Sequence, residues 1–314
     1  MIIFSDIVMT VMLLILLCFL VIIQFSKQFT FQSRSPLSLR LFMIDEDMKK
    51  ILILGGSGFV GGNFIREYQS YAETSKKFGK PKPTEIISVS RRGIKESNDG
   101  VVRIISVRGD ATNETFLNEV FSKYGPFDVC VHAMGLLLDS NSGDILKQLN
   151  KYASGSGSDA SPDATYDKVT RLSAYSAIDN LIAQSRKETR VPAFIFISAA
   201  EAGWTIDPPV DWLRRYLIAK RQVENRLLSL NNDSDSSLRA VIFRPSLIWT
   251  WKRPQALISV VPFYAASKLG FPFVDRPTTL EDLVRAMVYA VEDNSVRGIK
   301  RFADIDSLVK KSPL

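Results

Sequence analysis

Short apolar runs alternate with longer stretches of mixed polarity from residue 49 onwards. The runs predict strands at Ile51–Leu54, Ile86–Ser90, Val102–Val107, Asp128–His132, Ala193–Ser198 and Ala240–Arg244. Helical periodicity between them predicts helices such as Asn113–Lys123, Tyr166–Ser185 and Trp212–Leu230. Short, wholly apolar strands that alternate with helices are typical of parallel sheets covered on both faces. The pattern therefore predicts an α/β fold, a Rossmann-type doubly wound parallel sheet.

Another hydrophobic pattern precedes this domain. Residues 7–25 are almost wholly apolar and uncharged, and 19 such residues just suffice to span a bilayer. Lys27, Arg34 and Arg40 follow the run, so the positive-inside rule places the domain on the cytosolic or matrix side. We favour a membrane anchor, but two alternatives stay open. Residues 24–44 are basic, rich in serine and free of acids, like a mitochondrial presequence that is cleaved, and an upstream start codon is the other explanation.

The predicted organisation has two parts. Residues 1–47 form an anchor or leader with a basic linker, and residues 48–314 form the Rossmann domain. Within that domain, a small C-terminal subregion at about residues 245–278 is expected to shape a pocket for a substrate or partner. Trp249–Phe273 is rich in Trp, Phe, Tyr and Pro, which indicates an apolar ligand, a partner surface or ordinary packing.

Composition excludes several classes of function. The net charge is +7, but the basic residues are dispersed and not interleaved with aromatics, which disfavours binding to nucleic acid. The chain has two cysteines, far apart, and one histidine, so the sequence indicates neither a disulfide framework nor a metal centre.

The strongest chemical signal is the glycine-rich stretch between the first strand and the helix that continues at Asn63. Its glycines form the pattern G-x-x-G-x-x-G. The first glycine permits a tight turn, the second lets a pyrophosphate approach the backbone, and the third lets the helix pack closely on the strand. The helix N-terminus adds free N–H groups and a positive dipole end. A glycine turn without a ligand is the alternative. The predicted cofactor-binding residues here are Gly55, Ser57, Gly58, Phe59, Val60 and Gly61.

Arg91 and Arg92 follow the second strand, where dinucleotide folds read the adenosine ribose. An acid there would suit the 2′-hydroxyl of NAD, whereas the planar fork of arginine suits the 2′-phosphate of NADP. The sequence therefore favours NADP(H) over NAD(H), with two solvated surface arginines as the alternative. Asp110, after the third strand, either accepts a hydrogen bond from the adenine amino group or caps the helix that starts at Asn113.

Small residues end the fourth strand. Ala133, Met134 and Gly135 are predicted cofactor contacts, because small side chains let a nucleotide lie close to the carboxyl edge of the sheet. His132, just before them, is interpreted as a packed residue rather than a catalyst.

Tyr216 and Lys220 form a Y-x-x-x-K pair, and a spacing of four places both side chains on one face of a helix. An ammonium beside a phenol is expected to lower the pKa of the phenol. Such a tyrosine can exchange a proton with a carbonyl or alcohol during hydride transfer. Ser198 ends a predicted strand 18 residues earlier.

These motifs together resemble the short-chain dehydrogenase/reductase superfamily in its extended and atypical branch, over about residues 48–311. Arg244-Pro245-Ser246 is similar to the Arg-Pro-Gly of the family, which borders the nicotinamide. The resemblance implies a nicotinamide dinucleotide as ligand, Pro245 and Lys220 as cofactor contacts, and Tyr216, Lys220 and Ser198 as catalytic residues. Residues 131–138, 196–203 and 220–224 look most like the mitochondrial members linked to coenzyme Q biosynthesis and related to the NADPH-binding accessory subunit of respiratory complex I.

One departure from the family divides the functional hypotheses. Alignment puts Ala199 where the family has its substrate-holding serine or threonine, and Ser198 one position earlier, on the other face of a regular strand. The first hypothesis is an NADP(H)-dependent oxidoreductase, anchored through residues 7–25 in the mitochondrial inner membrane on the matrix side, or in the endoplasmic reticulum facing the cytosol. The second is a non-catalytic NADPH-binding subunit or assembly factor of a complex of quinone synthesis or respiration. A sugar-nucleotide epimerase or dehydratase is the third, which Arg91 and Arg92 disfavour.

Overall fold

The computed structural model describes residues 48–78, 82–136, 164–188, 191–206, 208, 210–232, 237–252, 264–265, 267–268 and 275–312. The expected anchor at residues 7–25 and most of the expected subregion at 245–278 lie outside these ranges. Across the ranges given, every helix is too short or too polar to cross a bilayer.

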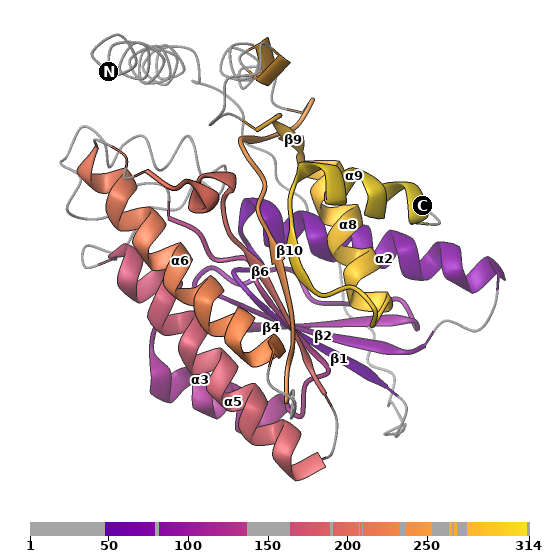
Figure 1. Ribbon diagram of the computed structural model, residues 1–314. Helices are drawn as coiled ribbons and strands as arrows, with labels where there is room; N and C mark the ends of the chain where they lie inside the picture. The colour runs from indigo at the N-terminus through magenta and orange to yellow at the C-terminus, as the bar shows by residue number, and fades with distance from the viewer. Residues whose placement is uncertain are drawn as a thin grey trace, which may run out of the picture.

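An eight-stranded sheet forms the centre of the domain (Figure 1). Its strands are β1 (Lys49–Leu54), β2 (Thr84–Ser90), β3 (Ser97–Asn98), β4 (Val102–Arg108), β5 (Val129–His132), β6 (Ala193–Ile197), β7 (Arg239–Phe243) and β10 (Gly298–Lys300). The order is β10-β7-β6-β5-β1-β2-β4-β3, and only the short β3 runs antiparallel to its neighbour. A separate parallel pair joins β8 (Ile248–Trp249) to β9 (Thr278–Thr279).

Helices cover both faces of the sheet. One face carries α2 (Phe59–Phe78), α8 (Leu280–Glu292) and α9 (Phe302–Lys311), and the other carries α3 (Glu114–Tyr124), the π-helical turn η1 (Asp167–Leu172), α5 (Ser173–Glu188) and α6 (Asp211–Asn232) (Figure 1). Because strand side chains alternate between faces, Ile51 and Ile53 enter the core under α2 and α8, and Leu52 and Leu54 enter the core under α3 and α5. The doubly wound α/β fold expected from the sequence is confirmed.

The connection order creates a switch point beside β1. The chain leaves β1 for β2 and β4 on one side, then crosses back to place β5, β6 and β7 on the other side. Helices that follow β1 and β5 therefore lie on opposite faces, and a crevice is expected at the carboxyl ends of these two strands, where ligands of such sheets bind.

The six expected strands are present with ends shifted by at most two residues. Two features were not predicted. Helix α2 begins at Phe59, inside the glycine motif, and continues to Phe78. The strands β3, β8, β9 and β10 are only two or three residues long and carry no apolar run.

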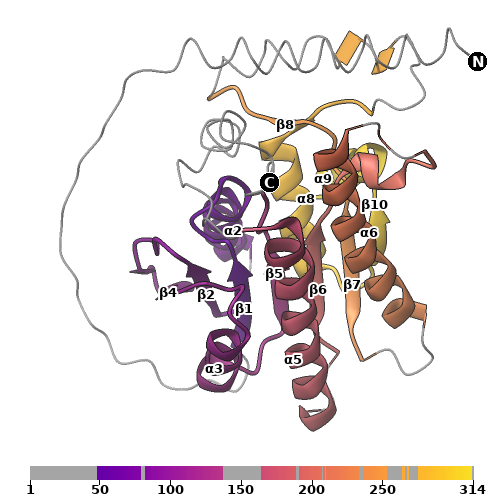
Figure 2. The same ribbon diagram turned by 90° about the vertical axis from the view of Figure 1, so that its left-hand side faces the viewer.

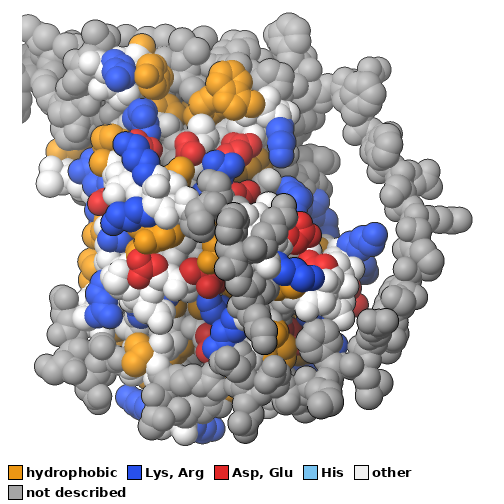
Figure 3. All heavy atoms as spheres, turned by 90° about the vertical axis from the view of Figure 1, so that its right-hand side faces the viewer, with side chains coloured by type: hydrophobic (Ala, Val, Ile, Leu, Met, Phe, Trp, Pro, Cys, Tyr) orange, Lys and Arg blue, Asp and Glu red, His pale blue; other side chains and the backbone are white. Residues whose placement is uncertain are grey.

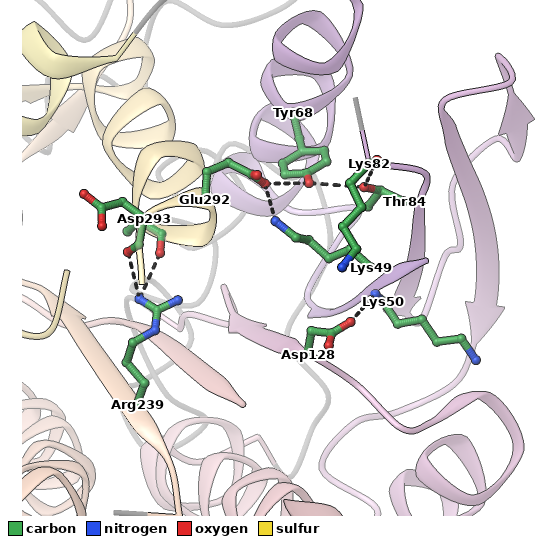
Figure 4. A network of polar contacts seen from close by, with 10 residues as sticks. Lys49, Lys50, Tyr68, Lys82, Thr84, Asp128, Arg239, Glu292 and Asp293 are labelled. Atoms are coloured by element: carbon green, nitrogen blue, oxygen red, sulfur yellow. Dashed lines mark hydrogen bonds and ion pairs between the residues drawn. The ribbon is translucent and has the colours of Figure 1, made fainter. Parts of the chain in front are cut away.

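The amino ends of the strands are closed by polar contacts (Figure 4). Glu292, at the end of α8, accepts hydrogen bonds from the Lys49 ammonium at 2.8 Å and the Tyr68 hydroxyl at 2.7 Å. Asp128 accepts one from the Lys50 backbone N–H at 2.7 Å. These contacts join β1, α2 and α8 at one edge of the sheet, and the predicted functional residues lie at the opposite edge.

Candidate nucleotide-binding site

The turn after β1 can be built only with glycine at its key positions. Gly55 has a φ of +91°, in the region that side chains disfavour, and a Cβ there would lie 2.9 Å from the Ala133 carbonyl oxygen. The Gly58 N–H donates to the Gly55 carbonyl at 2.9 Å, and a Cβ on Gly61 would lie 2.4 Å from the same oxygen. The backbone thus folds back on itself and brings the first turn of α2 to the carboxyl edge of β1.

The other residues of the glycine motif complete the turn. Phe59 and Val60 open α2 and pack partly against the core beneath it. The Ser57 carbonyl accepts a hydrogen bond from the Arg92 guanidinium at 3.3 Å, so Arg92 reaches over the turn from the end of β2. The positive dipole end of α2 and this cation both favour an anionic group at the turn.

Three arginines meet where β2 and β4 end. Arg91 and Arg92 are exposed directly after β2, and Arg108 pairs in register with Ser90 of β2. Arg108 also crosses Gly93, because a Cβ on Gly93 would lie 2.7 Å from its Nε. Sequence reasoning missed Arg108. The signal was available, since neighbouring parallel strands end at the same edge.

Asp110 closes the turn between β4 and α3. Its Oδ1 accepts hydrogen bonds from the Thr112 N–H at 3.0 Å and the Thr112 hydroxyl at 2.9 Å. The cap of α3 is Asn113, whose side chain accepts from the Phe116 N–H at 3.1 Å. The alternative interpretation of Asp110 as the cap of that helix is therefore wrong.

The segment after β5 lies against the glycine turn. Ala133 donates its N–H to the Leu54 carbonyl at 2.9 Å, which continues the β1–β5 ladder past His132. The Ala133 carbonyl and the Met134 N–H are the atoms that a Cβ on Gly55 would meet, whereas Gly135 is exposed. Residues 55–61 and 133–134 are thus brought together as predicted.

His132 itself is wholly buried. Its Nε2 lies 2.8 Å from the Ser173 hydroxyl, which donates its own proton to the Val169 carbonyl at 2.7 Å. The ring must therefore donate from Nε2, and it is neutral. Burial, with a smaller contribution from the Lys220 charge, lowers the pKa of His132 to about 3. His132 is a packed residue, as interpreted from the sequence.

Lys220 reaches from α6 to the end of β6. Its ammonium donates to the Ile197 carbonyl at 2.6 Å and lies 5.6 Å from the centre of the Tyr216 ring, so the pair shares one face of α6 as predicted. Tyr216 in turn packs edge-to-face on Tyr166, with ring centres 5.5 Å apart.

The lowered pKa that the sequence predicted for Tyr216 is wrong, because its pKa is raised. Burial raises the pKa of the Tyr216 phenol well above its usual range, and the Glu201 carboxylate raises it further. Burial also lowers the pKa of Lys220 to about 8, against an opposing effect of Glu224. The spacing rule predicts proximity correctly, but it takes no account of desolvation.

Ser198 lies on the same side of the sheet as Tyr216 and Lys220. Phe194 and Phe196 of β6 enter the core under α5 and α6. The chain stays extended past them, because the Ser198 N–H donates to the Phe243 carbonyl at 2.7 Å and Ala199 has φ and ψ of −145° and 149°. Alternation therefore turns Ser198 towards α6 and Ala199 away from it. The extended strand end thus puts Ser198, and not Ala199, on the side of Tyr216 and Lys220.

The buried hydroxyls that lack a protein partner within the described ranges include those of Ser198 and Ser246, near the carboxyl ends of β6 and β7. Ser246 follows Pro245, whose carbonyl accepts from the Ala200 N–H at 2.8 Å, so the ends of β6 and β7 are tied together. Buried hydroxyls normally have a hydrogen-bond partner. Both side chains, and the glycine turn that a Cβ would fill, fit a bound nucleotide with its substrate.

A buried ion pair ties α6 to the end of β7 beside these residues. Glu224, one turn beyond Lys220, accepts two hydrogen bonds from the Arg244 guanidinium, one of them at 2.9 Å. Arg221 donates to the carbonyls of Ala202 and Trp204, which fixes the short 3-10 helix η2 (Ala200–Gly203) to α6.

Glu201, in η2, is a titratable group that sequence reasoning missed. Burial raises the pKa of its carboxyl to about 7, and the Asp275 carboxylate adds to the rise. An acid in the otherwise small and apolar run after Ser198 was the available signal.

Comparison with solved structures supports the fold. The chain is similar to an oxidoreductase of the short-chain dehydrogenase/reductase family from Burkholderia thailandensis, with a TM-score of 0.52, 15% identity and coverage of 81% of this chain and 90% of that one. A short-chain dehydrogenase from Leptospira borgpetersenii with bound NAD+ is similar with a TM-score of 0.53 and 14% identity, over 86% of this chain and 96% of that one. The closed form of a serine dehydrogenase complexed with NADP+ is similar with a TM-score of 0.53 and 14% identity, over 81% of this chain and 94% of that one.

No protein-family model matches the sequence. At these identities the similarity establishes the fold alone, that of short-chain dehydrogenase/reductase structures, of which the Leptospira enzyme holds NAD+ and the serine dehydrogenase NADP+.

Proposed function

We propose that the protein is a short-chain dehydrogenase-like oxidoreductase that binds NAD(P)(H) and interconverts a carbonyl and an alcohol. The observation that carries the proposal is the glycine turn at the switch point, where Gly55 and Gly61 leave no room for a Cβ and the start of α2 faces the crevice. This arrangement suits a pyrophosphate.

The bound nicotinamide would supply or accept the hydride. In the reductive direction, Tyr216 donates its phenolic proton to the carbonyl oxygen as the hydride reaches the carbon, and in the oxidative direction it takes that proton back. Lys220 is held by its hydrogen bond to the Ile197 carbonyl. When ligand is bound, the positive charge of Lys220 favours the phenolate form of Tyr216. Ser198, with an unpartnered hydroxyl on the same side of the sheet, holds the substrate oxygen.

We propose a preference for NADP(H). Arg92 lies over the turn, Arg91 is its neighbour, and Arg108 adds a third guanidinium at the same edge. Charge-assisted hydrogen bonds to a 2′-phosphate contribute about 1.5–3 kcal/mol each. Loss of two of these contacts would lower the affinity for NADPH more than tenfold and leave the affinity for NADH nearly unchanged.

Thermal-shift titration of the full chain tests both claims. At about 100 times Kd the nucleotide adds about 2.7 kcal/mol to the unfolding free energy, so a rise in Tm is expected with NADPH and a smaller one with NADH. The absence of any rise with either would refute nucleotide binding. Arg91→Ala with Arg92→Ala should abolish the difference between the two nucleotides, and Arg186→Ala, an exposed arginine in the last turn of α5, is the matched control.

A non-catalytic nucleotide-binding subunit is the second candidate. The raised pKa of Tyr216 favours it, because a phenol that stays protonated is a poor base. Tyr216→Phe separates the two. If the protein is an oxidoreductase, this variant binds NADPH normally but does not rescue a strain that lacks the gene, whereas full rescue would establish the structural role.

The cellular setting is proposed from the resemblance in sequence alone. We place the protein in the mitochondrial inner membrane with its domain in the matrix, as part of a complex of quinone synthesis or respiration, and the endoplasmic reticulum facing the cytosol is the alternative. Residues 7–25 would be the anchor. Fractionation of the native protein, followed by carbonate extraction, tests the compartment and the anchor together.

A further inference from the structure

A group of aromatic and basic side chains, all exposed except the half-buried Trp249, lies beyond the carboxyl edge of the sheet. We call it the aromatic rim and define it as Trp249, Trp251, Lys252, Tyr264 and Lys268. Figure 2 shows β8 above the carboxyl ends of β1, β5 and β6, and the short pieces that hold Tyr264 and Lys268 lie at the same end in Figures 1 and 2. Figure 3 shows hydrophobic side chains next to lysine and arginine along this end of the molecule.

The rings of the rim are organised and accessible. Trp249 and Trp251 pack edge-to-face with ring centres 4.7 Å apart, and Trp251 is 69% exposed, the highest value among the large apolar side chains of the described residues. Tyr264 is 46% exposed, and the Lys268 ammonium lies 5.6 Å from its ring centre. An indole ring as exposed as that of Trp251 lacks the stabilisation that burial of its area would provide.

The combination of residue types indicates the occupant. Trp and Tyr are enriched where a protein meets the headgroup region of a bilayer, and lysines beside them are attracted by anionic lipids. The stretch Ile248–Lys252 holds two tryptophans and a lysine but no acid. A bilayer that accepts the rings and pairs the ammonium groups satisfies both features.

The chain outside the described ranges permits this placement. Residues 26–47 join the apolar run 7–25 to Met48, and these 22 residues can extend over about 70 Å. Strand β1 has 6 residues and spans about 20 Å. A linker of this length lets either end of the domain face the bilayer, although it is attached at the amino edge.

We propose that the aromatic rim docks on the lipid headgroup region, so that the carboxyl edge of the sheet, with its nucleotide site, faces the membrane. The inference rests on the proposal that residues 7–25 anchor the protein. It implies that the substrate of the proposed oxidoreductase is a membrane-dissolved carbonyl or alcohol that reaches Tyr216 from the bilayer.

Tryptophan fluorescence of the full chain in vesicles tests the docking. All four tryptophans, Trp204, Trp212, Trp249 and Trp251, lie in the domain and none in residues 1–47, so emission reports the domain rather than the anchor. The vesicles are phosphatidylcholine with a minority of phosphatidylglycerol, prepared with normal or bromine-substituted acyl chains. Bromine should quench the wild-type emission, and Trp251→Phe should remove about half or more of that quenching, because the outermost ring reaches deepest.

Two variants control the result. Trp212→Phe, in the first turn of α6, should leave the bromine-dependent quenching intact. Lys252→Glu should weaken docking about fivefold or more in the anionic vesicles and have little effect in pure phosphatidylcholine. Equal quenching in wild type and Trp251→Phe, or failure of the full chain to float with the vesicles, would overturn the proposal. Stabilisation by NADPH, measured on the same samples, reports the proposed function independently of docking.

Discussion

The ion pair between Glu224 and Arg244 provides a sharp test of how the site is supported. Its two side chains are 2% and 16% exposed, and the Lys220 ammonium lies one helical turn away on the same side. Glu224→Ala removes the carboxylate that the Arg244 guanidinium contacts with two hydrogen bonds. Two buried cations then remain without their counter-charge.

The expected loss is large. Breaking a buried pair by removing one partner costs about 3–5 kcal/mol, because the remaining charge stays desolvated. Since a whole domain is stable by only about 5–15 kcal/mol, Glu224→Ala should remove about a fifth or more of the free energy of unfolding. The exposed pair of Asp179 with Arg226 is the matched control. Its carboxylate is 61% exposed, so Asp179→Ala should cost at most about 1 kcal/mol.

Denaturant unfolding measured by tryptophan fluorescence gives both values on the same scale. The slope of the unfolding free energy against denaturant concentration should be the same in all three proteins, so that midpoints can be compared directly. If Glu224→Ala and Asp179→Ala lose similar amounts, or if Glu224→Ala loses less than about 1 kcal/mol, the ion pair does not support the site in the way argued above.

Two further results are expected. Gly61→Ala should abolish stabilisation by NADPH, because its Cβ would lie 2.4 Å from the Gly55 oxygen. Gly62→Ala is the control and should keep most of the stabilisation, because its Cβ would lie 3.2 Å from the nearest atom. Equal stabilisation of the two variants would argue against the turn as the site. The single histidine, His132, is neutral in the folded protein, where its pKa is about 3, against 6.5 in the unfolded chain. Its contribution to the free energy of unfolding is therefore complete above pH 6.5 and is lost as the pH falls below that value. Between pH 7 and 5 the wild type should lose about 2 kcal/mol more than His132→Leu, as denaturant titrations at the two pH values would show, and equal losses would contradict the neutral buried ring.

The sequence predicted the sheet well because its strands are buried on both faces. Such strands are unbroken apolar runs in the sequence, as Ile51–Leu54 shows. Their position can therefore be predicted without knowledge of the rest of the fold. The glycine turn is equally local, since the positive φ of Gly55 and the close approach of Gly61 leave a signature in the sequence itself. Strands of two residues, such as Thr278–Thr279, depend on tertiary pairing and carry no such signature.

The chemistry of the site was predicted less completely, since pKa values depend on burial. Spacing placed Lys220 beside Tyr216 correctly, but desolvation, which spacing does not report, reverses the expected shift of the phenol. Glu201 and Arg108 were missed because each meets its neighbours only through the packing of η2 and the register of β4 with β2. The orientation of Ser198 likewise required the extended backbone at Ala199.

The contacts at the amino edge of the sheet bear on the order in which the protein folds. The Lys49–Glu292 ion pair joins residues 243 positions apart (Figure 4). The core beneath α2 is completed by Leu283, Met287 and other side chains of α8. During synthesis, nearly the whole chain must therefore be made before the face of the sheet under α2 is covered. The half of the domain that holds the glycine turn is synthesised first, but its core is completed last. The glycine turn and the C-terminal helices should therefore gain protection from hydrogen exchange together.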